Sequence, residues 1–176
     1  CLFLNESKKT KKYYPFDFDL RIEVTLKINC LEFEIKINNK TEIAMPINFG
    51  LHPYFNISDF KNLEFIDYPL NCQNQEKNII SNTWDELNNV NLGVDLLMYT
   101  SGRSSFQDKI FKRQITLNHP YPFDIGVIWS DPPRRMICLE PWTSPRNSFV
   151  DGFRNIMVSS NDSKRINASI QIKSLK

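Results

Sequence analysis

Apolar and polar residues alternate along two neighbouring stretches near the start of the chain. Between Leu20 and Ile28 every second residue is apolar, and the alternation resumes from Leu31 to Ile37 after Asn29 and Cys30. A period of two is typical of a β-strand that buries one face. Two such strands with so short a connection predict an antiparallel hairpin.

Further apolar or alternating runs are separated by turns rich in proline, asparagine and aspartate. They cover residues 63–66, 96–100, 111–117, 125–130, 136–140 and 166–172. The only helix predicted is a short one from Asn82 to Leu87, with Asn82 as a candidate cap. The chain contains no linker or internal repeat, so we expect a single all-β domain over residues 1–176, built as an antiparallel β-sandwich.

Composition narrows the kind of partner. The chain is 41% hydrophobic and 12% aromatic, which is sufficient for a sizeable core. Twenty-two Lys and Arg against 20 Asp and Glu give a net charge of +2, with both signs spread along the chain. Such a distribution favours neither nucleic acid nor an anionic membrane, and no apolar run reaches the roughly 18 residues of a membrane span. We therefore expect a small-molecule partner.

The four cysteines, Cys1, Cys30, Cys72 and Cys138, are far apart and form no C-x-x-C pair. This spacing predicts free thiols rather than disulfides or a zinc site, and it favours a reducing, cytoplasmic location. The chain opens on a cysteine, close to the Lys-rich stretch 8–12. From this opening we expect that further residues precede it.

The first segment with distinctive chemistry is residues 49–55, FGLHPYF, which follows the hairpin. Pro53 favours an extended backbone at His52, and the aromatic residues can form apolar walls around the imidazole. An imidazole exchanges protons near neutral pH, so His52 is a candidate acid or base. The alternative is a packed histidine that bonds a backbone carbonyl.

The second segment is residues 138–147, CLEPWTSPRN, in which Glu140 ends an apolar run. Partial burial there disfavours the ionised carboxylate and raises its basicity, which suits a general base. Alternatively, Glu140 is a solvated residue or forms a salt bridge with Arg134, Arg135 or Arg146.

Together these two segments closely resemble the aldose 1-epimerase, or galactose mutarotase-like, family, and residues 14–18 with the following hairpin resemble it as well. The resemblance covers the chain from about Tyr13 to its end. It implies a large antiparallel supersandwich of which this chain is the carboxyl-terminal portion. It further implies interconversion of the α and β anomers of a hexose or hexose phosphate, without a metal or an organic cofactor.

The resemblance implies that His52 is the general acid on the ring oxygen and that Glu140 is the general base on the anomeric hydroxyl. Asp95, in the segment GVDLL of residues 93–97, matches a family aspartate that binds sugar hydroxyls. A turn aspartate is the alternative for Asp95. His119, the only other histidine, is interpreted as a loop residue.

Other residues of the two segments are candidates for substrate binding. Trp142 and Tyr54, with Phe55, are candidates for a wall against the apolar sugar face or, alternatively, for plain core positions. Arg146 and Asn147 could bond sugar hydroxyls, and Arg146 could also bond a phosphate or brace its loop by pairing with a carboxylate.

Two departures from the family leave room for a second function. The chain has no counterpart of the roughly one hundred amino-terminal residues of full-length relatives, and its WTSPRN segment replaces an acidic F-P-D-type segment. The substrate therefore stays open, and a non-catalytic carbohydrate-binding or regulatory domain is the alternative function. A β-sandwich interaction domain with structural His52 and Glu140 is a third interpretation.

Overall fold

The computed structural model describes residues 1–176, and most of its regular secondary structure consists of antiparallel strands. The strands are β1 (Leu2–Asn5), β2 (Phe18–Lys27), β3 (Cys30–Asn39), β4 (Met45–Ile47), β5 (Tyr54–Asn56), β6 (Leu63–Ile66), β7 (Asn71–Asn74), β8 (Ile79–Asn82), β9 (Val94–Tyr99), β10 (Arg103–Asp108), β11 (Arg113–Asn118), β12 (Ile125–Ser130), β13 (Met136–Trp142), β14 (Ile156–Val158) and β15 (Ser163–Ser174). The helices are α1 (Thr83–Leu87) and α2 (Ser148–Asp151), with 3-10 turns at Thr10–Lys12 and Phe60–Asn62. The prediction of an all-β fold is confirmed.

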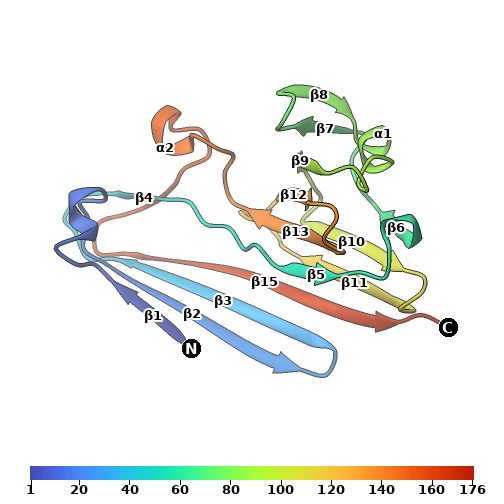
Figure 1. Cartoon of the computed structure of the whole chain (residues 1–176). Helices are drawn as coiled ribbons and strands as arrows, with labels where there is room; N and C mark the ends of the chain where they lie inside the picture. Colours follow the sequence, from blue (N-terminus) through green and yellow to red (C-terminus); the bar gives the residue numbers. More distant parts are fainter.

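Two sheets form the layers of the sandwich (Figure 1). The larger has seven strands in the order β1-β2-β3-β15-β11-β10-β6, and the smaller has six in the order β5-β13-β12-β9-β7-β8. Strands β14 and β4 form a separate two-stranded ribbon. In both sheets the neighbouring strands are antiparallel, and strands distant in sequence pair directly, as β3 does with β15.

The hairpin predicted near the start of the chain is formed by β2 and β3, with Lys27 opposite Cys30. Its base is buried, because Ile35 and Ile37 lie in a core cluster together with Ile166 of β15. Its tip corrects the expectation of one continuously buried face: Leu26 and Ile28 are 81% and 93% exposed. The hairpin lies on the β1 side of the larger sheet (Figure 1), and its tip packs against neither of the two larger core clusters, so its apolar residues stay uncovered.

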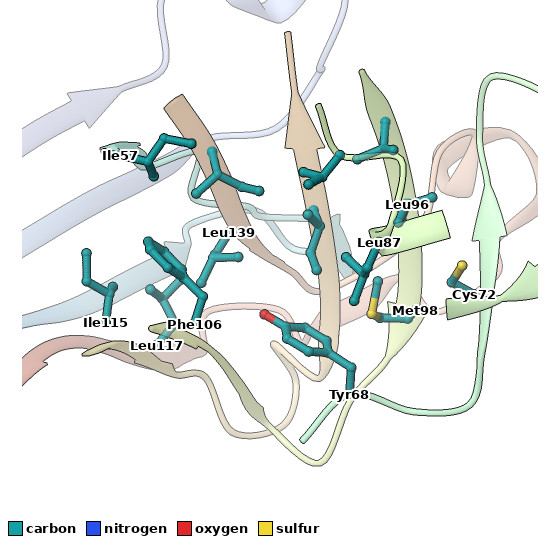
Figure 2. Close-up of a cluster of buried hydrophobic side chains, with 14 residues drawn as sticks. Ile57, Tyr68, Cys72, Leu87, Leu96, Met98, Phe106, Ile115, Leu117 and Leu139 are labelled. Atoms are coloured by element: carbon teal, nitrogen blue, oxygen red, sulfur yellow. The ribbon is translucent and has the colours of Figure 1, made fainter. Parts of the chain in front are cut away.

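The main core lies between the two sheets. Phe106, Ile115 and Leu117 from the larger sheet meet Leu96 and Leu139 from the smaller one, and the cluster has 14 buried residues in all (Figure 2). Burying this apolar surface is the principal stabilisation of the sandwich. The opposite face of the six-stranded sheet lies outside this core.

Local signals behave as expected at α1. The side chain of Asn82 accepts hydrogen bonds from the backbone N–H groups of Trp84 and Asp85, as a helix cap does.

No helix has the length and apolar character that crossing a bilayer requires. All four cysteines carry free thiols.

Candidate active site

The site lies on the face of the six-stranded sheet that points away from the main core. Alternation along β13 sends Ile137 and Leu139 into the core and Cys138 and Glu140 to the opposite face. The register sets Glu140 opposite Val127 of β12 and sets Cys138 opposite Trp129. One strand further, Trp129 lies opposite Asp95 of β9. Residues from three strands therefore share one surface.

His52 reaches Glu140 because the segment before β5 follows the edge of β13. Gly50 forms an isolated antiparallel bridge with Trp142, and Tyr54 pairs with Cys138. The same register places His52 opposite Glu140. Side chains of such cross-strand partners lie on one face, about 5 Å apart at Cβ.

Gly50 suits this close approach. A Cβ at this position would lie 3.0 Å from Cδ1 of Trp142, so the indole would have to shift by a few tenths of an ångström to admit a larger residue. The glycine in the FGLHPYF segment thus allows the chain to pass closely over β13.

The imidazole and the carboxylate are in direct contact. Nε2 of His52 lies 3.2 Å from Oε1 of Glu140, and the two side chains are 49% and 3% exposed. The ring of His52 stacks on Tyr54 at a centroid distance of 4.9 Å and meets Trp129 edge to face at 5.8 Å. A buried carboxylate is thereby joined to a histidine that solvent and ligand can reach.

Burial raises the pKa of Glu140 from its ordinary value of 4.5 to about 7. The negative charge of Asp95 also raises this pKa, whereas Trp142 and Arg146 lower it. Nε1–H of Trp142 donates a hydrogen bond to Oε2 at 3.1 Å, and Arg146 contributes a positive charge. At neutral pH, Glu140 can therefore either hold or accept a proton.

Asp95 and Arg146 form an ion pair at the margin of this surface. The guanidinium of Arg146 donates to Oδ2 of Asp95 at 2.9 Å, and Nε2 of Gln75 donates to Oδ1 at 2.6 Å. Arg146 is mostly exposed whereas Asp95 is largely covered. The alternative in which Arg146 pairs with a carboxylate is the arrangement observed, and the charges of both residues act on Glu140.

Trp142 and Asn147, the other two candidates for substrate binding, differ in how close they lie to the His52–Glu140 pair. Trp142 is half-buried and packs against Leu97, Ile125 and Val127, so besides being a potential wall it holds Glu140 through its indole N–H. Asn147 is exposed, has a left-handed backbone with φ of 66°, and begins α2 without a side-chain capping bond. The structure does not bring its side chain into contact with the His52–Glu140 pair.

Sequence reasoning missed three residues of this surface. Trp129 and Gln75 were not candidates because only the pairing of β12 with β9 and the position of the β7–β8 turn bring them to Asp95. Cys138 was visible in the CLEPWTSPRN segment, but not as a ligand. Its thiol, the imidazole of His52 and the carboxylate of Glu140 lie within 4.8 Å of one another and could hold a metal ion.

His119 lies in a loop, as predicted, but it is fully buried. Its Nε2 bonds Oγ of Ser104 at 2.9 Å and its Nδ1 lies 2.5 Å from the carbonyl oxygen of Phe123. Burial lowers its pKa, which favours the neutral ring. This histidine links β10 to the loop before β12.

The structure thus combines a buried carboxylate in contact with an accessible histidine and an antiparallel sandwich fold. The family model described as aldose 1-epimerase matches residues 1–165. The chain therefore belongs to the aldose 1-epimerase family.

The relatives are distant in sequence. Protein LacX of Lactococcus lactis subsp. lactis, in its plasmid and chromosomal forms, is 24% identical over 164 residues, which is 79% of this chain. The chain spans 54% of those relatives.

Solved structures share the fold. The Slr1438 protein from Synechocystis sp. PCC 6803 has a TM-score of 0.93 at 24% identity, covering 98% of this chain and 61% of its own. A galactose mutarotase-like protein from Clostridium acetobutylicum has a TM-score of 0.79 at 17% identity, with 98% and 62% covered. A putative aldose 1-epimerase from Escherichia coli K12 has a TM-score of 0.78 at 15% identity, with 99% and 65% covered.

Proposed function

We propose that the protein is a mutarotase that interconverts the α and β anomers of a hexose or hexose phosphate. The observation that carries this proposal is the 3.2 Å contact between His52 Nε2 and Glu140 Oε1. The ring oxygen and the anomeric hydroxyl of a pyranose are bonded to the same carbon, C1, so an acid and a base that serve both must lie close together. Membership of the aldose 1-epimerase family supports the same chemistry.

The reaction needs only proton transfers. Glu140 removes the proton from the hydroxyl on C1 while protonated His52 donates to the ring oxygen, and the bond between C1 and the ring oxygen breaks to give the open aldehyde. After rotation about C1–C2, the hydroxyl formed from the ring oxygen adds to the other face of the aldehyde. His52 takes back its proton from that hydroxyl, and Glu140 returns its proton to the oxygen on C1. Each positioned group contributes roughly 100- to 10,000-fold.

The surrounding residues suit a sugar. Carboxylate and guanidinium groups of Asp95 and Arg146 can accept and donate hydrogen bonds to hydroxyls, and Arg146 can also bind a phosphate. Tyr54 and Trp129 present aromatic surface beside His52, against which the C–H face of a pyranose can pack.

Polarimetry tests the proposal. Freshly dissolved α-D-glucose, α-D-galactose and α-D-glucose 6-phosphate should equilibrate faster with the protein than in buffer alone, for at least one of the three. Glu140→Gln should reduce that catalysed rate at least about 100-fold, because an amide cannot act as a base. Glu64→Gln, at an exposed position of the edge strand β6, is the matched control and should leave the rate unchanged. Full activity in the Glu140→Gln protein would exclude this residue as the base.

The second candidate is a carbohydrate-binding domain without turnover. It is favoured by the openness of the site at His52 and by the fact that the chain spans only about half the length of its curated relatives. Thermal protection by a sugar that the protein does not equilibrate would support this candidate against the enzyme.

A further inference from the structure

Cys138 places a third potential ligand atom at the His52–Glu140 pair. It lies two residues before Glu140 on the same face of β13, and its backbone pairs with Tyr54, the residue two after His52. The thiol is fully buried, as is the carboxylate, whereas the imidazole is half-exposed. The three potential ligand atoms, Sγ, Nε2 or Nδ1, and a carboxylate oxygen, lie within 4.8 Å of one another.

This is a ligand set for a borderline-soft divalent cation. Thiolate, imidazole and carboxylate are the three groups that bind Zn²⁺ in proteins, at distances of about 2.0 to 2.3 Å. A tetrahedral ion with such bonds separates its ligand atoms by roughly 3.3 to 3.7 Å. The His52–Glu140 contact of 3.2 Å already matches one edge of that tetrahedron. Rotation of the half-exposed imidazole can bring it to an ion held by Cys138 and Glu140.

Charge and access also fit such an ion. A thiolate and a carboxylate neutralise a 2+ charge, so the bound ion leaves no net charge at this covered position. The half-exposed edge at His52 leaves the fourth position open to water. Mg²⁺ and Ca²⁺ are disfavoured, because they require six or more oxygen ligands and a thiolate is a poor one.

We propose that His52, Cys138 and Glu140 bind one Zn²⁺-class ion and that this ion inhibits the protein. The inhibitory part rests on the proposed function. An ion on these ligands occupies the lone pairs with which His52 and Glu140 would exchange protons, so the site holds either the metal or a reacting sugar. The metal therefore acts as a competitor for the site.

Other thiols must be separated from this site in the test. Cys1 and Cys30 are at least partly accessible and can bind metal on their own, so both are replaced by serine in every protein used. Cys72 of β7 is buried like Cys138 but lies on the core side of the smaller sheet. Cys72→Ser is therefore the matched control for Cys138→Ser.

Binding is measured by calorimetry with Zn²⁺ and by the ultraviolet thiolate-to-metal band with Cd²⁺. One equivalent should bind to the Cys1→Ser/Cys30→Ser protein and to its Cys72→Ser derivative. Cys138→Ser and, independently, His52→Asn should each weaken binding by more than the roughly 10- to 100-fold that loss of an outer partner costs. Because His52 is half-exposed, His52→Asn should fold, so it still tests the site if the Cys138→Ser protein fails to fold. Undiminished binding in either variant, or no binding in the parent, would overturn the proposal.

Inhibition is measured separately by polarimetry. Zn²⁺ should abolish the catalysed rate, EDTA should restore it, and higher sugar concentration should raise the Zn²⁺ concentration required, with Zn²⁺ in buffer as the blank. One equivalent of bound Zn²⁺ without loss of rate would refute the inhibitory part. A protein that never catalyses mutarotation would refute the proposed function, and the binding measurements would still decide the metal site.

Discussion

Glu140 is acted on by groups that shift its pKa in opposite directions. Burial and the charge of Asp95 raise it, whereas the indole N–H of Trp142 and the charge of Arg146 lower it, and the balance is about 7. A base with this pKa is half-ionised at neutral pH, close to the optimum for proton transfer. Small changes around Glu140 should therefore be visible as shifts in the pH dependence of activity.

Trp142 should tune the pKa of Glu140 through its hydrogen bond. The acidic limb of kcat/KM, measured by polarimetry across pH, should have its midpoint near pH 7 rather than near 4.5. Trp142→Phe removes a hydrogen bond that favours the ionised carboxylate, so the midpoint should move to higher pH. An unchanged midpoint in the phenylalanine variant would show that the indole N–H does not tune the base.

The ion pair of Asp95 with Arg146 should tune the same pKa. Asp95→Asn removes a negative charge that raises the pKa of Glu140, so the acidic limb should move to lower pH. Arg146→Gln removes an opposing positive charge, so the limb should move to higher pH. Shifts in the same direction would contradict an electrostatic coupling. Increases in KM in both variants, by contrast, would indicate contact with the sugar.

The sequence identified the residues of the site only in part. The motifs place His52, Glu140 and Asp95 in one family pattern, whereas Arg146 belongs to the departing WTSPRN segment. The structure brings these four residues onto one surface. Trp129 could not be foreseen, because its position depends on the pairing of β12 with β13 and β9, which no local pattern encodes. The roles proposed for His52 and Glu140 remain predictions until turnover is measured.

Among the elements, β13 connects stability to chemistry. Leu139 is completely buried in the main core, and its neighbour Glu140 faces the site. Leu139→Ala should therefore lower the free energy of unfolding by roughly 2 to 5 kcal/mol, measured by urea denaturation. Leu26→Ala, at the exposed hairpin tip, is the matched control and should stay within about 0.5 kcal/mol. Equal losses in the two variants would contradict the assigned core.

Elements were predictable where apolar residues alternate over a long stretch, as in the β2–β3 hairpin. The three-residue strands β4, β5 and β14 are too short to show a period. Strand β10 was missed for another reason: Ser104, Ser105 and Asp108 are polar yet buried, and hydrogen bonds satisfy them, for example from Ser105 Oγ to the carbonyl of Ile115 at 3.0 Å.

For the whole molecule, the raised pKa of Glu140 predicts a pH-dependent stability. The folded state holds the Glu140 proton up to about pH 7 and the unfolded state only up to about 4.5. The contribution of this residue is therefore complete below 4.5 and is lost as pH rises to 7, by up to about 3 kcal/mol.

Glu140→Gln lacks this titration, because the amide resembles the protonated acid. The free energy of unfolding of the variant, minus that of the unmodified protein, should increase between pH 5 and 8 and stay constant at higher pH. The measurement is chemical denaturation of both proteins over that range, and the difference between them cancels the other titrating groups. A constant difference would mean that Glu140 has an ordinary pKa in the folded protein.

The strict alternation along β13 also determines what kinds of genetic change this protein tolerates. Substitutions can alter the core at Leu139 or the chemistry at Glu140 separately, because the two side chains point in opposite directions. Deletion or insertion of one residue within the strand exchanges the two faces, placing a carboxylate in the core and a leucine at the site. Evolution can therefore adjust this strand by replacing its residues, while its length is constrained by both requirements at once.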